Sequence, residues 1–244
     1  THAEITMLES PFLANGEFEE LTRMFRDQAT QIDCTFPVDG GADALGEALA
    51  RIRAEAEDAV RSGNGHIILT DEGISASRVG VPMILATSAV HSWLTRKGLR
   101  TFCSLNVRAS ECVDPHDFAV LIGCGATTVN PYLAQDTLAE RIERGLLDGN
   151  LIDIMTRYRE AIDAGLLKIM AKMGISVLSS YRGGLNFEAV GLSRAMVAEY
   201  FPGMQSRISG IGLHGLQAKL EEAHAKGFRA ALVDLLPVGG FYKA

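Results

Sequence analysis

The stretch His66-Ile67-Ile68-Leu69-Thr70, followed by Asp71-Glu72-Gly73, decides the fold. A short apolar run bounded by turn residues is typical of a strand buried on both faces of a parallel sheet. Upstream, apolar residues at helical spacing predict a helix over residues 42–62, which ends at Ser62-Gly63-Asn64-Gly65. A helix, a turn and a buried strand in this order form the repeating unit of a parallel α/β protein.

The same pattern recurs along the chain. Strands are predicted over residues 32–36, 66–70, 100–107, 127–130 and 175–178, and helices over residues 42–62, 82–96, 116–121, 134–144, 151–173, 193–200 and 213–226. We therefore expect an α/β fold whose parallel βα units form an incomplete, barrel-like or open sheet flanked by helices. No low-complexity linker interrupts the pattern, so we expect one domain over residues 1–226 and a packed connector over residues 227–244.

Composition excludes several classes of protein. The 244 residues are 47% hydrophobic and carry a net charge of −7, with Lys and Arg spread along the chain. This argues against nucleic acid or a membrane surface as a partner. The longest apolar runs are shorter than the roughly 20 residues of a membrane span. From its two ends, at Thr1 and Ala244, we expect the sequence to be a segment cut from a longer chain.

The cysteines indicate a reducing, cytoplasmic setting. Cys34, Cys103, Cys112 and Cys124 are widely spaced and lie in or beside apolar runs, without a CxxC pair or a histidine at metal spacing. The N-terminus carries acidic residues and lacks the basic start of a signal peptide.

Two loops are candidate functional sites. Asp71 and Glu72 follow a predicted strand, at the end where parallel folds place functional groups, although both carboxylates also suit the cap of a helix or loop. Ser179 to Gly184 contains an arginine and two glycines that could cradle a phosphate, or the segment is a plain exit loop.

Other patterns carry less chemistry. The GxG at residues 123–125 precedes a predicted strand, whereas a dinucleotide fingerprint follows one. His91 and His116 lack an orienting partner at a defined spacing, so structural or interface roles are expected for them. The residues alone predict no catalytic, cofactor-binding or metal-binding set.

Several stretches resemble one known family. They include GCGA at residues 123–126, VNPYLA at 129–134, GLLKIMAKMGIS at 165–176, SYRG at 180–183 and FEAVGL at 187–192. These motifs are similar to the central domain of the glutamate synthase large subunit, and the resemblance extends over nearly the whole chain. In that family an amidotransferase domain releases ammonia from glutamine, and a synthase domain with FMN and a 3Fe-4S cluster makes L-glutamate from 2-oxoglutarate.

The resemblance implies a connecting, non-catalytic domain that helps to enclose the ammonia path. Its partners would be the flanking amidotransferase and synthase domains of the same chain, and it would hold no cofactor itself. Two loops are then candidates for domain interfaces or for the ammonia tunnel; their residues are Thr70, Asp71, Glu72, Gly73, Ser180, Tyr181, Arg182 and Gly183.

Two alternatives stay open at this point. One is a stand-alone α/β protein that binds a small molecule or phosphate through Ser180 and Arg182. The other is a lyase or aldolase-like barrel relic that uses Asp71 or His116.

Overall fold

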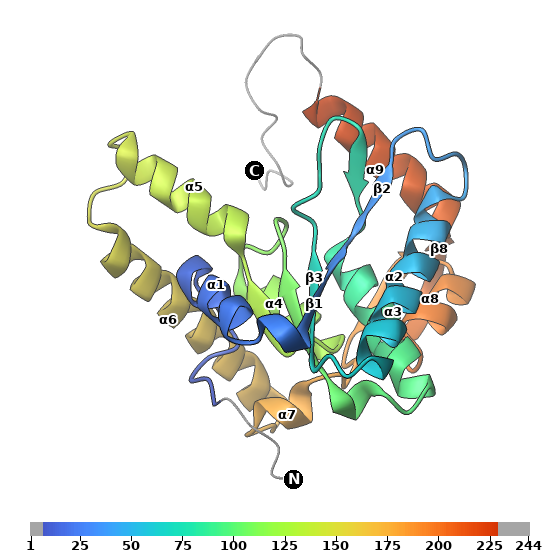
Figure 1. Ribbon diagram of the computed structural model, residues 1–244, viewed down its shortest axis with the longest axis horizontal. Helices are drawn as coiled ribbons and strands as arrows, with labels where there is room; N and C mark the ends of the chain where they lie inside the picture. The colour runs from blue at the N-terminus through green and yellow to red at the C-terminus, as the bar shows by residue number, and fades with distance from the viewer. Residues whose placement is uncertain (1–6, 229–244) are drawn as a thin grey trace.

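The computed structural model describes residues 7–228, and its centre is a four-stranded parallel sheet (Figure 1). The strands are β1 (Ala29–Asp33), β3 (His66–Thr70), β5 (Ser104–Arg108) and β6 (Thr128–Asn130), in the spatial order β1-β3-β5-β6. Leu69 pairs with Ile32 on one side and with Val107 on the other. Beside β6, Phe12 forms a parallel bridge with Val129, so the N-terminal segment adds an extended edge to the sheet.

The strands follow one another in space in the order of the chain. A doubly wound sheet reverses direction at a switch point, whereas successive units of a barrel always step the same way. The described residues form an open arc of such units without closing it. The predicted fold class, parallel βα units in an open sheet flanked by helices, is confirmed.

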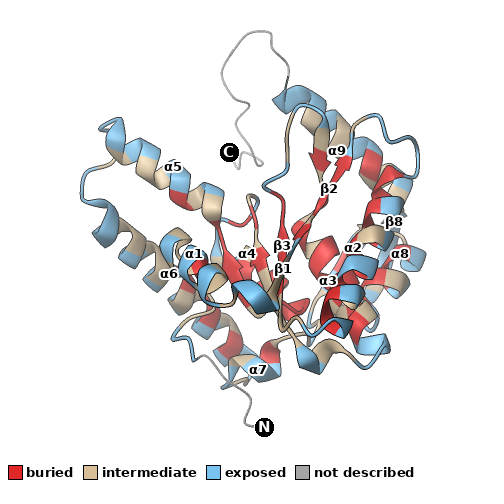
Figure 2. Cartoon of the chain, viewed as in Figure 1, coloured by how far each residue is buried: buried red, intermediate tan, exposed pale blue. Residues whose placement is uncertain are grey.

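The two faces of the sheet are covered very differently. Helices α2 (Ala44–Arg61), α3 (Met83–Arg96) and α4 (Pro115–Gly123) pack on one face, where alternate strand residues such as Leu69 and Val107 are completely or almost completely buried. On the other face Ile68 packs against Phe18 of α1 (Asn15–Met24). Figure 2 shows buried residues concentrated on the strands and on the inner sides of α2 and α3.

Two further helices form an antiparallel hairpin on one side of the molecule (Figure 1). They are α5 (Tyr132–Glu143) and α6 (Leu151–Lys172), and α6 also packs against α4. A Cβ at Gly165 would lie 2.4 Å from Cβ of Pro115, so glycine permits the close approach of α6 to the start of α4. The helix runs through Gly165 unbroken.

The remaining elements surround this core. They are the short helices η1 (Arg26–Gln28), η2 (Arg100–Phe102) and α7 (Leu178–Tyr181), the antiparallel pair β2 (Thr35–Pro37) and β4 (Arg78–Gly80), the parallel pair β7 (Glu188–Leu192) and β8 (Gln205–Ile211), and helices α8 (Arg194–Tyr200) and α9 (Leu213–Gly227).

Three predicted strands differ from the observed ones. Residues 32–36 belong to two strands, because the chain leaves the central sheet at Cys34 and then pairs with β4. Residues 100–102 form a short helix, so β5 begins only at Ser104. Residues 175–178 are not a strand. Gly174 ends α6 with a φ of 70°, and the chain turns directly into α7.

The predicted domain limits can be compared with the structure only in part. Gly227 ends α9, and residues 229–244 of the predicted connector lie outside the described residues. The cysteines carry free thiols, as expected, and only Cys103 is not fully buried. None of the helices described is both long enough and apolar enough to cross a membrane.

Candidate functional site

The loop from Thr70 to Gly73 lies at the carboxyl edge of the sheet, as predicted. Asp71 is buried, and its carboxylate accepts hydrogen bonds from the Ser110 amide at 2.9 and 3.0 Å and from the Ser110 hydroxyl at 2.6 Å. Burial raises the pKa of Asp71, while these hydrogen bonds favour its ionised form. Asp71 therefore ties the exit loop of β3 to that of β5.

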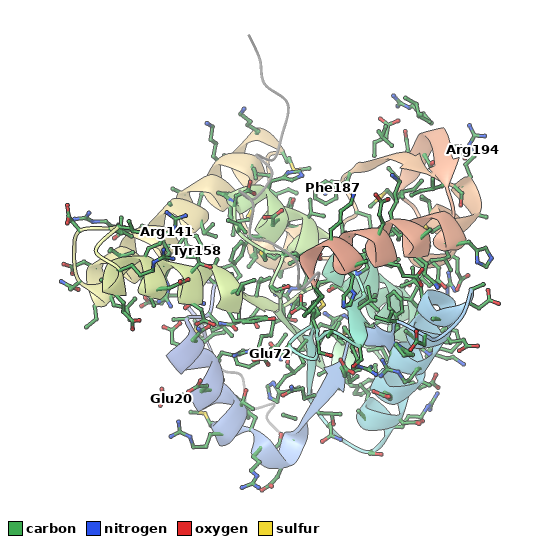
Figure 3. The ribbon with its side chains drawn as sticks, turned by 90° about the horizontal axis from the view of Figure 1, so that it is seen from above. Glu20, Glu72, Arg141, Tyr158, Phe187 and Arg194 are labelled. Carbon is green, nitrogen blue, oxygen red and sulfur yellow. The ribbon has the colours of Figure 1, made fainter. Side chains whose placement is uncertain are left out.

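Glu72 belongs to a neighbouring cluster on the same edge. Its carboxylate pairs with Arg108 at 2.9 Å, and the Arg108 guanidinium lies 4.8 Å from the ring centre of Phe18 and 5.1 Å from that of Tyr132. In the view of Figure 3, Glu72 lies near the middle of the molecule, whereas Glu20 of α1 and Arg141 of α5 lie towards its rim. Arg108 thus joins α1 and α5 to the sheet.

This geometry does not support a lyase site. Both oxygens of Asp71 accept hydrogen bonds from Ser110, which hold the carboxylate against the exit loop of β5. His116 is exposed in the first turn of α4, where its amide donates to Asp114 at 2.8 Å. No hydrogen bond within residues 7–228 joins its ring to Asp71.

The second predicted loop lies at the opposite, amino edge of the sheet. The Gly183 amide donates at 3.1 Å to the carbonyl of Ile122, in the last turn of α4, which precedes β6 in the chain. The Ser180 and Gly184 amides donate to the carbonyls of Val177 and Tyr181. These amides are therefore occupied within the chain, and the backbone cradle of the phosphate-binding alternative is not formed. The two predicted loops are not brought together.

A histidine lies beneath this second loop. The His91 ring packs so closely that a Cβ at Gly125 would lie 2.4 Å from it and a Cβ at Gly183 would lie 2.8 Å from it. Nδ1 of His91 accepts a hydrogen bond from Nε of Arg100 at 3.0 Å. Burial, followed by the charges of Arg100 and Arg182, lowers the pKa of His91 to about 4. The ring is therefore neutral at pH 7, with its proton on Nε2.

A third feature, absent from the sequence prediction, is a polar row on the open face of the sheet. His66 Nδ1 lies 2.9 Å from Ser104 Oγ, and the Asn106 amide donates to the same oxygen at 3.1 Å. The Thr128 hydroxyl donates to Asn106 Oδ1 at 2.7 Å. The row thus crosses β3, β5 and β6 without a charged side chain.

This polar row lines a cavity of about 370 Å³ between α1 and the sheet. Within residues 7–228, no Asp, Glu, Lys or Arg lines the cavity. The Phe25 ring stacks on His66 with centroids 4.1 Å apart, and burial lowers the pKa of His66. At neutral pH the cavity therefore offers uncharged hydrogen-bonding groups inside a largely apolar wall.

The sequence did contain a signal for the row. Ser104 and Asn106 alternate with the apolar Leu105 and Val107, which is the pattern of a strand with one buried and one polar face. Within residues 7–228, no three His, Cys, Asp or Glu side chains are grouped to hold a metal ion.

Comparison with known families decides the assignment. The model of the glutamate synthase central domain matches residues 1–193. The chain belongs to the glutamate synthase central domain family. This confirms the resemblance found in the sequence motifs.

The relatives of this glutamate synthase central domain are long chains. It is 59% identical to the glutamate synthase [NADPH] large chain of Azospirillum brasilense, over 100% of its own length and 16% of the relative. The corresponding protein of Bacillus subtilis is 37% identical, over 91% of this chain and 14% of the relative. A ferredoxin-dependent glutamate synthase of Pyropia yezoensis is 33% identical, over 99% and 16%. The chain thus spans about a sixth of the length of these relatives.

Proposed function

We propose that this chain is the connecting domain of a glutamate synthase and that its open sheet face walls part of the ammonia path. The parent enzyme would make L-glutamate from glutamine and 2-oxoglutarate. FMN and the 3Fe-4S cluster would bind in its synthase domain, outside this chain. The flanking amidotransferase and synthase domains would be its partners.

The uncharged cavity is the observation that carries the proposal. An amine is mostly protonated in neutral water, and only the unprotonated form is a nucleophile. A passage for ammonia must therefore exclude bulk water and offer no strong proton donor. The lining meets the second requirement, because its polar groups are hydroxyls, amides, a thiol and the imidazole of His66.

The size of the cavity and the rigidity of its wall also fit. A volume of about 370 Å³ is far above the roughly 15 Å³ that holds one water-sized molecule. The strands beneath it are fixed by the ladder on both sides of β3 and by the buried helices behind. Hydrogen bonds among the row hold its groups in place and leave lone pairs for a small neutral guest.

The test fills the cavity in the full-length enzyme. Ser104→Phe places a ring among the lining residues, and Ser62→Phe adds the same ring at an exposed position beyond α2. We expect Ser104→Phe to lower glutamine-dependent glutamate formation while glutamine hydrolysis and synthesis from added ammonia continue. Ser62→Phe should leave all three rates unchanged.

A second, milder variant distinguishes loss of the ammonia path from misfolding of the domain. Thr128→Val removes one hydroxyl from the row at nearly constant volume, so it should weaken the coupling of the two half-reactions without unfolding the domain. If both cavity variants keep the wild-type ratio of glutamate formed to glutamine consumed, the proposed role of this face is wrong.

A further inference from the structure

The amino edge of the sheet holds positive charge that the described residues do not neutralise. Nine of the sixteen arginines in residues 7–228 form ion pairs with carboxylates, and of the seven that do not, only Arg100 and Arg182 are not exposed. Within residues 7–228, Arg100 and Arg182 have no such partner. Burial lowers the pKa of both Arg100 and His91, and the charge of Arg182 adds to each shift, so the three side chains lie within electrostatic reach of one another.

The donors of this cluster differ in how they are used. Arg100 donates to the carbonyls of Cys103 at 2.6 Å and Gly125 at 2.8 Å, and to His91, so it is fixed in place. Arg182 is half-buried, and its Nε makes no hydrogen bond to any described residue although it is out of contact with solvent. A buried, unpaired guanidinium N–H is costly, so a partner is expected for it.

His91 supplies a further donor on the same side. Because Nδ1 accepts from Arg100, the neutral ring carries its proton on Nε2. A Cβ at Gly183 would lie 2.8 Å from Nε2, so this atom sits against the residue that follows Arg182. A hydrogen-bond acceptor with negative charge would satisfy Nε2 of His91 and the guanidinium of Arg182 together.

Exposed apolar side chains flank the cluster. Phe102, in the same short helix as Arg100, is 68% exposed, and Val177, just before α7, is 52% exposed. An arginine beside exposed apolar side chains is a common composition for a protein interface. The occupant is therefore more consistent with a protein side chain than with a free ion.

We propose that the cluster of His91, Arg100 and Arg182 binds a carboxylate side chain from another domain of the same long polypeptide. The proposal rests on the connecting role proposed above, because it needs a neighbouring domain at this edge. It also gives a chemical identity to the contact predicted for residues 180–183. Most of the length of the relatives lies outside the matched segment, so a neighbour is available in cis.

Zero-length cross-linking tests this contact. Arg182→Lys keeps the positive charge and introduces an amine that a carbodiimide joins only to a carboxylate in direct contact. The wild-type arginine does not react in this way. In the full-length enzyme, we expect a cross-link from position 182 to an Asp or Glu outside residues 1–244, identified by mass spectrometry.

Arg144→Lys is the matched control, because Arg144 is exposed and pairs with Glu140 at 3.2 Å. It should cross-link to Glu140 alone. The proposal is overturned if position 182 is cross-linked only to residues 1–244. It is also overturned if position 182 forms no cross-link while the control reacts, which is the result expected if the cluster binds a free anion instead. The readout is contact and not activity, so the proposal survives if the cavity variants leave coupling unchanged.

Discussion

The titration of His91 gives the most quantitative test of the charged cluster at the amino edge. Burial and the two arginines lower its pKa from 6.5 to about 4 in the folded chain. The folded chain therefore binds fewer protons than the unfolded chain between these two values. The contribution of His91 to the free energy of unfolding is at its full value above pH 6.5, falls as the pH is lowered from 6.5 to 4, and levels off below 4.

The size of this effect follows from the shift. One pKa unit corresponds to about 1.4 kcal/mol, so the whole window is worth about 3 kcal/mol. Between pH 7.5 and pH 5 this difference in proton binding lowers the free energy of unfolding by about 2 kcal/mol. Because the ring is not fully buried, solvent screening reduces this figure, and we expect roughly 1–2 kcal/mol.

Urea unfolding of the chain at pH 7.5 and pH 5 measures the effect. His91→Gln removes the titrating group, so the fall in the free energy of unfolding between the two pH values should shrink by roughly 1–2 kcal/mol. The variant is also expected to be less stable at both pH values, and only the difference between them is the test. His116→Gln, at an exposed position, is the control and should keep the wild-type fall. An equal fall in His91→Gln and wild type would refute the reasoning.

Three further predictions concern stability and reactivity. Gly125→Ala should lower the free energy of unfolding, measured by thermal unfolding, by about 2–4 kcal/mol, because φ is 121° and the new Cβ would lie 2.4 Å from His91. The control is Gly63→Ala, where φ is 94° and the space around the new Cβ is open, so it should cost only about 1–2 kcal/mol. Asp71→Ala should cost about 1–3 kcal/mol in urea unfolding, because the half-buried amide and hydroxyl of Ser110 lose their acceptor. A cost near zero would contradict the proposed tie between loops. Burial raises the pKa of all four thiols, but only Cys103 among them is partly exposed, so iodoacetamide at pH 8 should modify Cys103 first; faster labelling of Cys34 would contradict the packing.

Much of the parallel sheet could be predicted from local patterns. The run from His66 to Thr70 is apolar on both sides of the pleat and is bounded by turns, so its burial in a sheet followed directly. The long helices followed from their apolar periodicity and from glycines at their ends. These features depend on residues close together in sequence, which a single sequence displays.

The predicted strands were wrong where the structure depends on whether a segment has another strand to pair with. The segment from residue 175 to 178 is apolar but has no neighbouring strand to pair with, and it turns into a short helix. Conversely, β7 and β8 are strands because they pair with each other, and neither has a strong pattern alone. The split at Cys34 likewise depends on β4, which is more than forty residues away in the chain.

The candidate site was predicted in part. The sequence located Asp71 at a strand end and Arg182 in a loop, but it could not show that they occupy opposite edges of the sheet. The cavity depends on the distance between α1 and a polar strand face, and its lining residues come from seven separate helices and strands. Such a juxtaposition is set by tertiary packing, and it becomes visible only once the sheet is assembled.

Isotope transfer in the full-length enzyme tests the central claim most directly. Glutamine labelled with nitrogen-15 in its side-chain amide is supplied together with excess unlabelled ammonium, and the label in the amino group of newly formed glutamate is measured. The account predicts that the wild type retains the label, that Ser62→Phe does so equally, and that Ser104→Phe forms glutamate with markedly less label. Equal retention of label in Ser104→Phe and wild type would contradict a role for this sheet face in the ammonia path.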